Sequence, residues 1–342
     1  MSVTIRQIAK EAKVSPTTVS NFLNNRSEQM SEETAKRIAA VIERLGYTPN
    51  LAARHMVRQR TGTIGVVAPL TWMRNMDFVT GKILSGISEV CFAHDFNISF
   101  VEDSNEQKVA KLLNKKRVDG VILFYSTVGD KLIDRVYEAE LPFALVNRKI
   151  DAPRVNYVHA DNYKGTYLAT NHLIEQGYRT LAYVTGHRTG DRAPGYETVP
   201  VDLERREGFK AALEEHGYPY DPSLVLDNRT LASGFERIIQ KPGPYGFVCF
   251  NDYWALMVRD LVEQRNLNVP QDVGIVGFDN TLIAGISRPQ LTSVRCPYYE
   301  MAETATRMLI ELINGKKPKQ TKILFDTELI VRQSSLRESK LK

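Results

Sequence analysis

The sequence predicts an all-α helix-turn-helix head at residues 1–48, a short linking segment at 49–60, and a two-lobed α/β domain at 61–342 with parallel, doubly wound sheets. Three observations predict this organisation. The chain has 342 residues, enough for two or three domains of ordinary size. Residues 1–60 hold ten Lys and Arg against five Asp and Glu, so this segment carries the whole formal net charge of +5. Beyond residue 61, short helices give way to buried strands alternating with amphipathic helices.

Composition excludes collagen-like, disordered and membrane-spanning proteins. Charged residues make up 25% of the chain and the mean hydropathy is -0.29, values typical of a soluble globular protein. We find no signal peptide and no run of about 18 apolar residues, so we expect a cytoplasmic protein without a membrane partner. Three widely spaced cysteines, without CxxC spacing, predict buried free thiols rather than disulfides or zinc ligands.

Enzyme motifs are also missing from the sequence. No Gly-x-Gly-x-x-Gly follows the first predicted strand, and neither a P-loop nor a Gly-x-Ser-x-Gly elbow occurs. The six histidines show no paired spacing of the kind that binds metals. We therefore expect no catalytic residues, no metal and no cofactor.

The first 45 residues predict three short helices. Thr4 can cap the first helix, and Ser15 followed by Pro16 opens a second that runs to Leu23. Ser31 caps a third helix, which Gly46 ends. Two helices joined by a tight turn and braced by a third form a helix-turn-helix.

The second helix predicts what the head binds. Its apolar residues share one face, which leaves short polar side chains pointing outward, a pattern suited to reading base edges in the major groove. The excess positive charge suits contact with phosphates. A plain three-helix bundle and a membrane-binding basic helix are the alternatives. We expect double-stranded DNA as the partner.

Several runs in this segment resemble the lactose/galactose-repressor family of bacterial regulators, and the resemblance spans the whole chain. The runs are Val3–Ala9, Val14–Asn24, Ser31–Thr34 and Leu45–Asn50. The resemblance implies that Pro16, Thr17 and Asn21 choose operator bases. It also implies that other polar residues hold phosphates, namely Thr4, Ser15, Thr18, Ser20 and Asn24. Asn21 stands where many members have Arg or His, and Asn pairs more readily with adenine.

The run 50–57 is too short to form a stable helix alone. The resemblance implies a hinge helix that orders on DNA, with a basic contact at Arg54 and an apolar wedge in the minor groove at Met56, where relatives usually have Leu. Methionine can also serve as such a wedge. The alternative is a plain linker.

Two series of strands and helices follow. The first contains strands at 64–69, 97–102, 118–125 and 143–147, with helices at 82–94 and 107–115. The second begins near Tyr157, with strands at 181–185, 247–250 and 274–277 and helices at 204–216 and 253–264. We expect the chain to cross between the lobes near 161 and 290. Ligands bind at the carboxyl ends of such strands, so a site between the lobes is expected.

Polar residues gather at those strand ends and suit a ligand rich in hydroxyl groups. The resemblance implies effector contacts from Arg205, Asn251 and Asp279. Asn147, often Asp in the family, matches a further contact, and Arg148 and Asp161 match positions near the cleft. For Asp161, Asp252 and Arg148 the alternative is a purely structural role, as acidic residues after strands often cap the next helix. We also expect Arg205 and Asp279 to lie on facing lobes.

Two segments depart from the family pattern. The loop after the first strand lacks the usual Asn-Pro-Phe-Phe run, so Trp72 or Phe78 could stack on a sugar ring or pack between the lobes. The insertion at 187–201 carries His187, Arg188 and Arg192, which could receive an anionic group, although a solvated loop is the favoured interpretation.

Together these features predict a homodimeric repressor that binds a near-palindromic operator and responds to a small metabolite, most simply a sugar or sugar derivative. A nucleobase or a protein corepressor is the alternative effector. A solute-binding protein shares the fold of residues 61–342 but would lack the head. The polar C-terminal run 332–342 contains no leucine heptads, so we expect a dimer rather than a tetramer. The sequence leaves open the effector, the sign of its effect and the operator sequence.

Overall fold

The computed structural model describes residues 3–23, 30–47, 60–68, 78–102, 106–113, 117–124, 130–150, 152–186 and 200–337. The chain divides into two compact units, residues 1–61 and 62–342. In the described ranges, no helix is long and apolar enough to cross a membrane. Within those ranges there is also no group of three or more His, Cys, Asp or Glu side chains placed to hold a metal ion.

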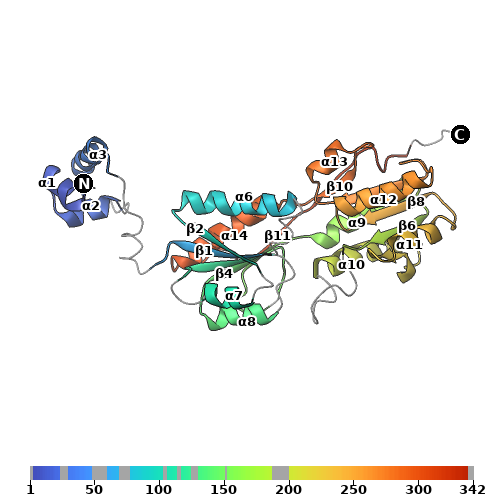
Figure 1. Ribbon diagram of the computed structural model, residues 1–342, viewed down its shortest axis with the longest axis horizontal. Coiled ribbons are helices and arrows are strands. Elements are labelled where there is room, and N and C mark those ends of the chain that lie inside the picture. The colour runs from blue at the N-terminus through green and yellow to red at the C-terminus, as the bar shows by residue number, and fades with distance from the viewer. Residues whose placement is uncertain are drawn as a thin grey trace. The chain divides into compact units, whose positions relative to one another are not determined.

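The first unit is the predicted three-helix head (Figure 1). Its helices are α1 (Ile5–Glu11), α2 (Pro16–Leu23) and α3 (Glu32–Leu45). The predicted caps are confirmed: the Thr4 side chain accepts from Gln7 N, the Ser31 side chain accepts from Thr34 N, and Gly46 ends α3 with a left-handed φ of 58°. A small apolar core joins the three helices, formed by Ile8, Ala9, Ala12, Val19, Ile38 and Val41.

The first lobe of the second unit is an all-parallel sheet of order β11-β5-β4-β3-β1-β2. Its strands are β1 (Thr63–Ala68), β2 (Asn97–Glu102), β3 (Gly120–Phe124), β4 (Phe143–Val146), β5 (Tyr157–Ala160) and β11 (Lys322–Phe325). Its helices are α6 (Phe78–Ala93), α7 (Glu106–Leu113), α8 (Asp130–Glu138) and α14 (Tyr298–Ile313). Helices α6 and α14 cover one face and α7 and α8 the other, so the strands are buried on both sides (Figure 1).

The second lobe is a sheet of order β12-β10-β9-β8-β6-β7, in which only the edge strand β12 is antiparallel to its neighbour. Its strands are β6 (Thr180–Val184), β7 (Val225–Leu226), β8 (Tyr245–Cys249), β9 (Val273–Phe278), β10 (Thr292–Arg295) and β12 (Glu328–Ile330). Its helices are α9 (Asn162–Glu175), α10 (Pro200–Glu215), α11 (Leu231–Ile238), α12 (Asp252–Gln264) and α13 (Leu282–Ile286), with a short 3-10 turn at Pro222–Leu224.

Two helices of this lobe pack very closely. A Cβ added at Gly208 of α10 would lie 2.2 Å from the carbonyl oxygen of Tyr163 in α9. Only glycine permits this approach of the two backbones. The close packing fixes the middle of α10 beside the start of α9, which matters for the site described below.

The chain passes between the two sheets three times. It leaves β5 for α9 at residue 161, leaves β10 for α14 at 296–297, and leaves β11 for β12 at 326–327. The expectation of two crossings, near 161 and 290, therefore missed the third and placed the second slightly early. The expectation that the second series begins near Tyr157 was wrong, because β5 pairs with β4 and β11 in the first sheet.

All three cysteines, Cys91, Cys249 and Cys296, are buried and free, as predicted.

Candidate functional site

The helix N-termini of the head are capped by two of the residues predicted to hold phosphates. The Thr4 hydroxyl accepts from Gln7 N at 3.3 Å, and the Ser15 hydroxyl accepts from Thr18 N at 3.0 Å. The Ser15 and Thr18 hydroxyls also lie 2.8 Å apart. The caps leave α1 and α2 beginning at exposed polar residues, where helix dipoles favour a phosphate.

The polar face of α2, predicted to contact base edges, is accessible to solvent. Ser15, Pro16 and Thr17 are exposed, and Thr18, Ser20 and Asn21 are partly exposed. Val19, on the opposite side, is buried in the head core. The helix can therefore present its polar side chains to a groove without losing its packing against α1 and α3.

At the carboxyl ends of the strands, three polar residues adopt left-handed backbone conformations. Asn147 has φ 58°, Asp279 has φ 91° and Asn280 has φ 42°. Such angles are uncommon outside glycine and carry strain that the surrounding structure must offset. Backbone strain of this kind concentrates at binding sites. These strand ends are therefore the strongest candidates for a ligand site in the second unit.

Asn147 follows β4 in the first lobe and is 1% exposed. Its backbone N–H donates a hydrogen bond to the Val158 carbonyl oxygen at 2.8 Å. Its side-chain oxygen is buried and has no hydrogen-bond partner among the described residues. A buried acceptor without a donor is costly, and a ligand N–H or O–H could supply one. Arg148 beside it is also buried.

Arg205 of α10 is likewise enclosed, at 2% exposed. Its Nε donates to Asn162 Oδ1 at 3.1 Å, and its Nη1 donates to the Phe250 carbonyl oxygen. The guanidinium carbon lies 3.5 Å from the centre of the Phe278 ring. Burial acts to lower the pKa of Arg205, but Tyr298 and Asp279 raise it above its usual value, so the side chain stays charged.

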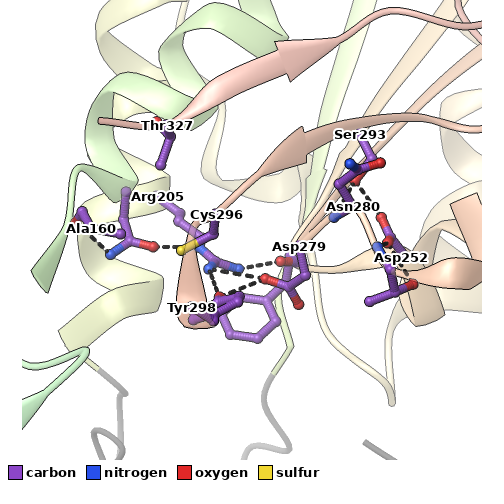
Figure 2. Close-up of polar contacts among 12 residues, drawn as sticks. Ala160, Arg205, Asp252, Asp279, Asn280, Ser293, Cys296, Tyr298 and Thr327 are labelled. Atoms are coloured by element: carbon purple, nitrogen blue, oxygen red, sulfur yellow. Dashed lines mark hydrogen bonds and ion pairs between the residues drawn. The ribbon is translucent and has the colours of Figure 1, made fainter. Parts of the chain in front are cut away.

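The counter-charge is Asp279, which follows β9. Its Oδ1 lies 3.6 Å from Arg205 Nη2 and accepts from the Tyr298 hydroxyl at 2.7 Å. Figure 2 shows the three side chains gathered at this point. Arg205 and Asp279 both belong to the second lobe, so the expectation that they lie on facing lobes was wrong. The close packing of α10 on α9 brings Arg205 beside the end of β9 instead.

A second buried carboxylate lies beside this pair. Asp252 opens α12, is 1% exposed, and accepts from Thr281 N at 2.6 Å and from the Ser293 hydroxyl at 2.5 Å (Figure 2). Burial, followed by the charge of Asp279, raises the pKa of Asp252 to about 7. Its partners join β9, β10 and α12, so Asp252 braces the strand end that carries Asp279 rather than capping its own helix.

Two predicted effector residues act as helix caps. Asn251 accepts from Trp254 N at 3.1 Å and caps α12, and Asp161 accepts from Lys164 N at 2.9 Å and caps α9. For Asp161 this was the stated alternative. In each cap, a side-chain oxygen already accepts a hydrogen bond from a backbone N–H. The Asn251 amide N–H groups can still donate to a ligand.

The remaining predicted residues are less informative. Phe78 is the first residue of α6 and is exposed. The predictions for Asn24, Arg54, Met56 and Trp72 lie outside the described residues. So does the insertion predicted at 187–201, except for Pro200 and Val201, which begin α10.

Sequence reasoning missed Tyr298, Asn162 and Phe278, which complete the surroundings of Arg205. Phe278 ends a strand just before Asp279, and this position was a usable signal. Asn162 and Tyr298 each begin a helix just after the chain crosses between sheets. The crossing near 161 was predicted and was a usable signal for Asn162, whereas the crossing before Tyr298 was placed near 290 instead of 296–297.

Comparisons with known proteins agree with both units. Residues 4–50 match the family model described as bacterial regulatory proteins, lacI family. Residues 170–335 match the model of a periplasmic binding protein-like domain.

Relatives match over nearly the full length. The HTH-type transcriptional regulator RegA of Clostridium saccharobutylicum is 33% identical over 345 residues, covering 98% of this chain and 100% of the relative. The HTH-type transcriptional repressor PurR of Aliivibrio salmonicida (strain LFI1238) is 30% identical over 341 residues, covering 97% of this chain and 98% of the relative.

Solved structures show the same architecture. The transcriptional regulator CelR–cellobiose complex matches with a TM-score of 0.70 and 26% identity, covering 97% of this chain and 99% of that one. The lac repressor dimer bound to operator and the anti-inducer ONPF matches with a TM-score of 0.73 and 21% identity, covering 98% and 100%. The latter likeness shows the fold alone.

Proposed function

Because this chain belongs to the lacI family of bacterial regulatory proteins, which are DNA-binding transcriptional regulators and not enzymes, we propose that it is a homodimeric repressor of a near-palindromic operator. A small metabolite rich in hydroxyl groups, bound between the lobes of the second unit, controls it. The protein acts in the cytoplasm, where operator DNA is found.

The head supports the first part of the proposal. A segment carrying the whole net charge folds into three helices with an exposed polar face on α2. Pro16, Thr17 and Asn21 read bases, while Thr4, Ser15, Thr18, Ser20 and Asn24 hold phosphates. Arg54 and Met56 act in a hinge helix that pairs with its counterpart on DNA. Two identical heads require two half-sites related by a two-fold axis.

The observation that carries the effector assignment is the Asp279–Arg205 pair, placed by strained backbone at a strand end. A carboxylate and a guanidinium 3.6 Å apart can bind two neighbouring hydroxyl groups, one donating and one accepting. Asn147 adds an unpaired acceptor from the first lobe. Phe78 or Trp72 adds an aromatic surface, and Asn251, Arg148 and Asp161 line the remaining strand ends. CelR, whose structure holds cellobiose, supports a sugar as the effector class.

A nucleobase is the second candidate effector. The HTH-type transcriptional repressor PurR of Aliivibrio salmonicida matches at 30% identity over almost the whole chain, and we take it as the reason to test nucleobases. The buried oxygen of Asn147 would accept a ring N–H as readily as a hydroxyl. A nucleobase would need aromatic stacking. Arg205 already lies over the Phe250 and Phe278 rings, so Phe78 or Trp72 would have to supply the stacking surface.

Control follows from differential binding. A metabolite that binds one arrangement of the lobes better than another shifts their populations, and operator affinity changes by the same coupling free energy.

A thermal-shift screen of sugars, sugar phosphates and nucleobases on the full chain tests the proposal. A hit should then change operator affinity in a fluorescence anisotropy titration, and Asp279→Ala should abolish that change while retaining operator binding. A hit that leaves operator affinity unaltered contradicts effector control. A hit among nucleobases alone favours the second candidate.

A further inference from the structure

Tyr298 connects the two lobes at the candidate effector site. It is the first residue of α14, whose apolar face packs on the first-lobe sheet and on α6. Its hydroxyl, however, lies between Asp279 and Arg205, which both belong to the second lobe (Figure 2). The residue is 1% exposed, so this contact is made away from water.

The Tyr298 hydroxyl makes the contacts that a ligand hydroxyl would make. It donates to Asp279 Oδ1 at 2.7 Å and accepts from Arg205 Nη2 at 3.4 Å. A hydroxyl has one donor and two acceptor positions, and a sugar hydroxyl offers the same set. The carboxylate and guanidinium are therefore already engaged by the protein itself.

We infer that Tyr298 is a built-in substitute for an effector hydroxyl: it occupies the Asp279–Arg205 pair in the ligand-free protein and has to leave when the effector binds. This inference rests on the proposed function, because it assigns regulation to the same site. Each Tyr298 contact that the effector replaces also releases a link between the lobes. Ligand binding and lobe rearrangement are thereby the same event.

The substitution Tyr298→Phe tests the inference because it removes the hydroxyl and keeps the buried ring. Without the competing hydroxyl, the pair should bind a sugar more tightly. Loss of one charged hydrogen bond predicts a gain of about tenfold in affinity, which is equivalent to about 1.4 kcal/mol. If the Tyr298 hydroxyl instead served only to position Asp279, removing it would lower the affinity for the sugar.

Tyr299→Phe is the matched control. Tyr299 is the next residue of α14 and donates to a carboxylate oxygen of Glu89 at 2.5 Å. The change removes the same chemical group, but from a contact between α14 and α6 in the first lobe. It should leave sugar affinity and lobe opening as in the wild-type protein.

A second measurement needs no ligand. Cys296 lies in the crossing segment two residues before Tyr298, and it is as fully buried as Cys91 and Cys249 in the lobe interiors. Burial raises the pKa of all three thiols, so none is intrinsically reactive. Maleimide labelling of the native full chain, followed by peptide mass spectrometry, compares their rates of opening.

The expected result is about tenfold faster labelling of Cys296 in Tyr298→Phe, with Cys91 and Cys249 unchanged, together with tighter binding of cellobiose or D-glucose by calorimetry. Weaker binding than in wild type, no detectable binding of either sugar by the variant, or unaltered Cys296 labelling would overturn the inference. Operator binding by the same variants is assayed separately. Loss of operator binding would contradict the proposed function. The thiol labelling and the sugar affinities would still decide the inference about Tyr298.

Discussion

Removing the Arg205 side chain should destabilise the second unit while leaving the head intact. In Arg205→Ala, the Asp279 carboxylate loses its counter-charge, and the Asn162 Oδ1 and Phe250 carbonyl acceptors lose their Arg205 donors. The ring of Phe278 loses the guanidinium stacked 3.5 Å from its centre.

The magnitude follows from burial. Arg205 is 2% exposed and Asp279 is 5% exposed, so water cannot replace the lost partner. Removing one member of a buried ion pair costs about 3–5 kcal/mol. The double variant Arg205→Ala with Asp279→Ala should cost less than the sum of the two single changes, because no unpaired charge remains.

Urea unfolding of the full chain measures this loss. Trp72 and Trp254 are the two tryptophans of the chain and both belong to the second unit, so their fluorescence reports that unit alone. Arg307→Ala is the control, because Arg307 is 55% exposed and pairs with Glu303 one turn away, a contact of small energy. A loss below about 1 kcal/mol for Arg205→Ala would refute the structural role assigned to the pair.

Further predictions concern the carboxylate at Asp252 and the head. Because burial and the Asp279 charge raise the pKa of Asp252 to about 7, the folded protein holds a proton that the unfolded chain releases from about pH 4. The free energy of unfolding should therefore fall as pH rises from about 4 to about 7, and Asp252→Asn should lack this part of the fall; equal pH profiles in urea would contradict it. Asn21→Ala should cost about 1–3 kcal/mol on the cognate operator and relax preference at one base pair, whereas an equal loss on all sequences would assign Asn21 to phosphates. Ser15→Ala should lower head stability by about 1 kcal/mol in thermal unfolding followed by circular dichroism, because the cap of α2 is lost, and should weaken binding to every sequence alike; unchanged stability would show that the cap contributes nothing.

The head was predictable because its signals are local. Ser31 and Gly46 mark the two ends of α3 by backbone chemistry that involves only neighbouring residues. The alternation of strands and helices in the second unit likewise gave the correct fold class. These features depend on a few consecutive residues, and the sequence displays them directly.

Helix α9 shows where local patterns fail. It was not predicted, because its buried face consists largely of small and polar residues, among them Gly165, Thr166, Thr170 and His172. Close packing between α10 and the sheet favours such residues, and no apolar stripe results. The crossing near 161 was predicted, but missing α9 concealed the position of its first residue, Asn162, beside Arg205.

The candidate site was predictable in composition but not in arrangement. Strand ends identified Asn147 and Asp279, and the resemblance identified Arg205. The placement of Arg205 and Asp279 in one lobe depends on how α10 packs against α9, more than 30 residues away in sequence. Such a long-range contact leaves no periodic mark in the chain.

Selection of operator DNA from a random pool by the full chain is the most direct test that this protein is a homodimeric, sequence-specific regulator. The account predicts enrichment of an inverted repeat whose half-site centres lie about 10 base pairs apart, set by two heads on one face of the duplex. Asn21→Ala should relax one position symmetrically in both half-sites. A pool without enrichment, or an enriched single half-site, would contradict the account.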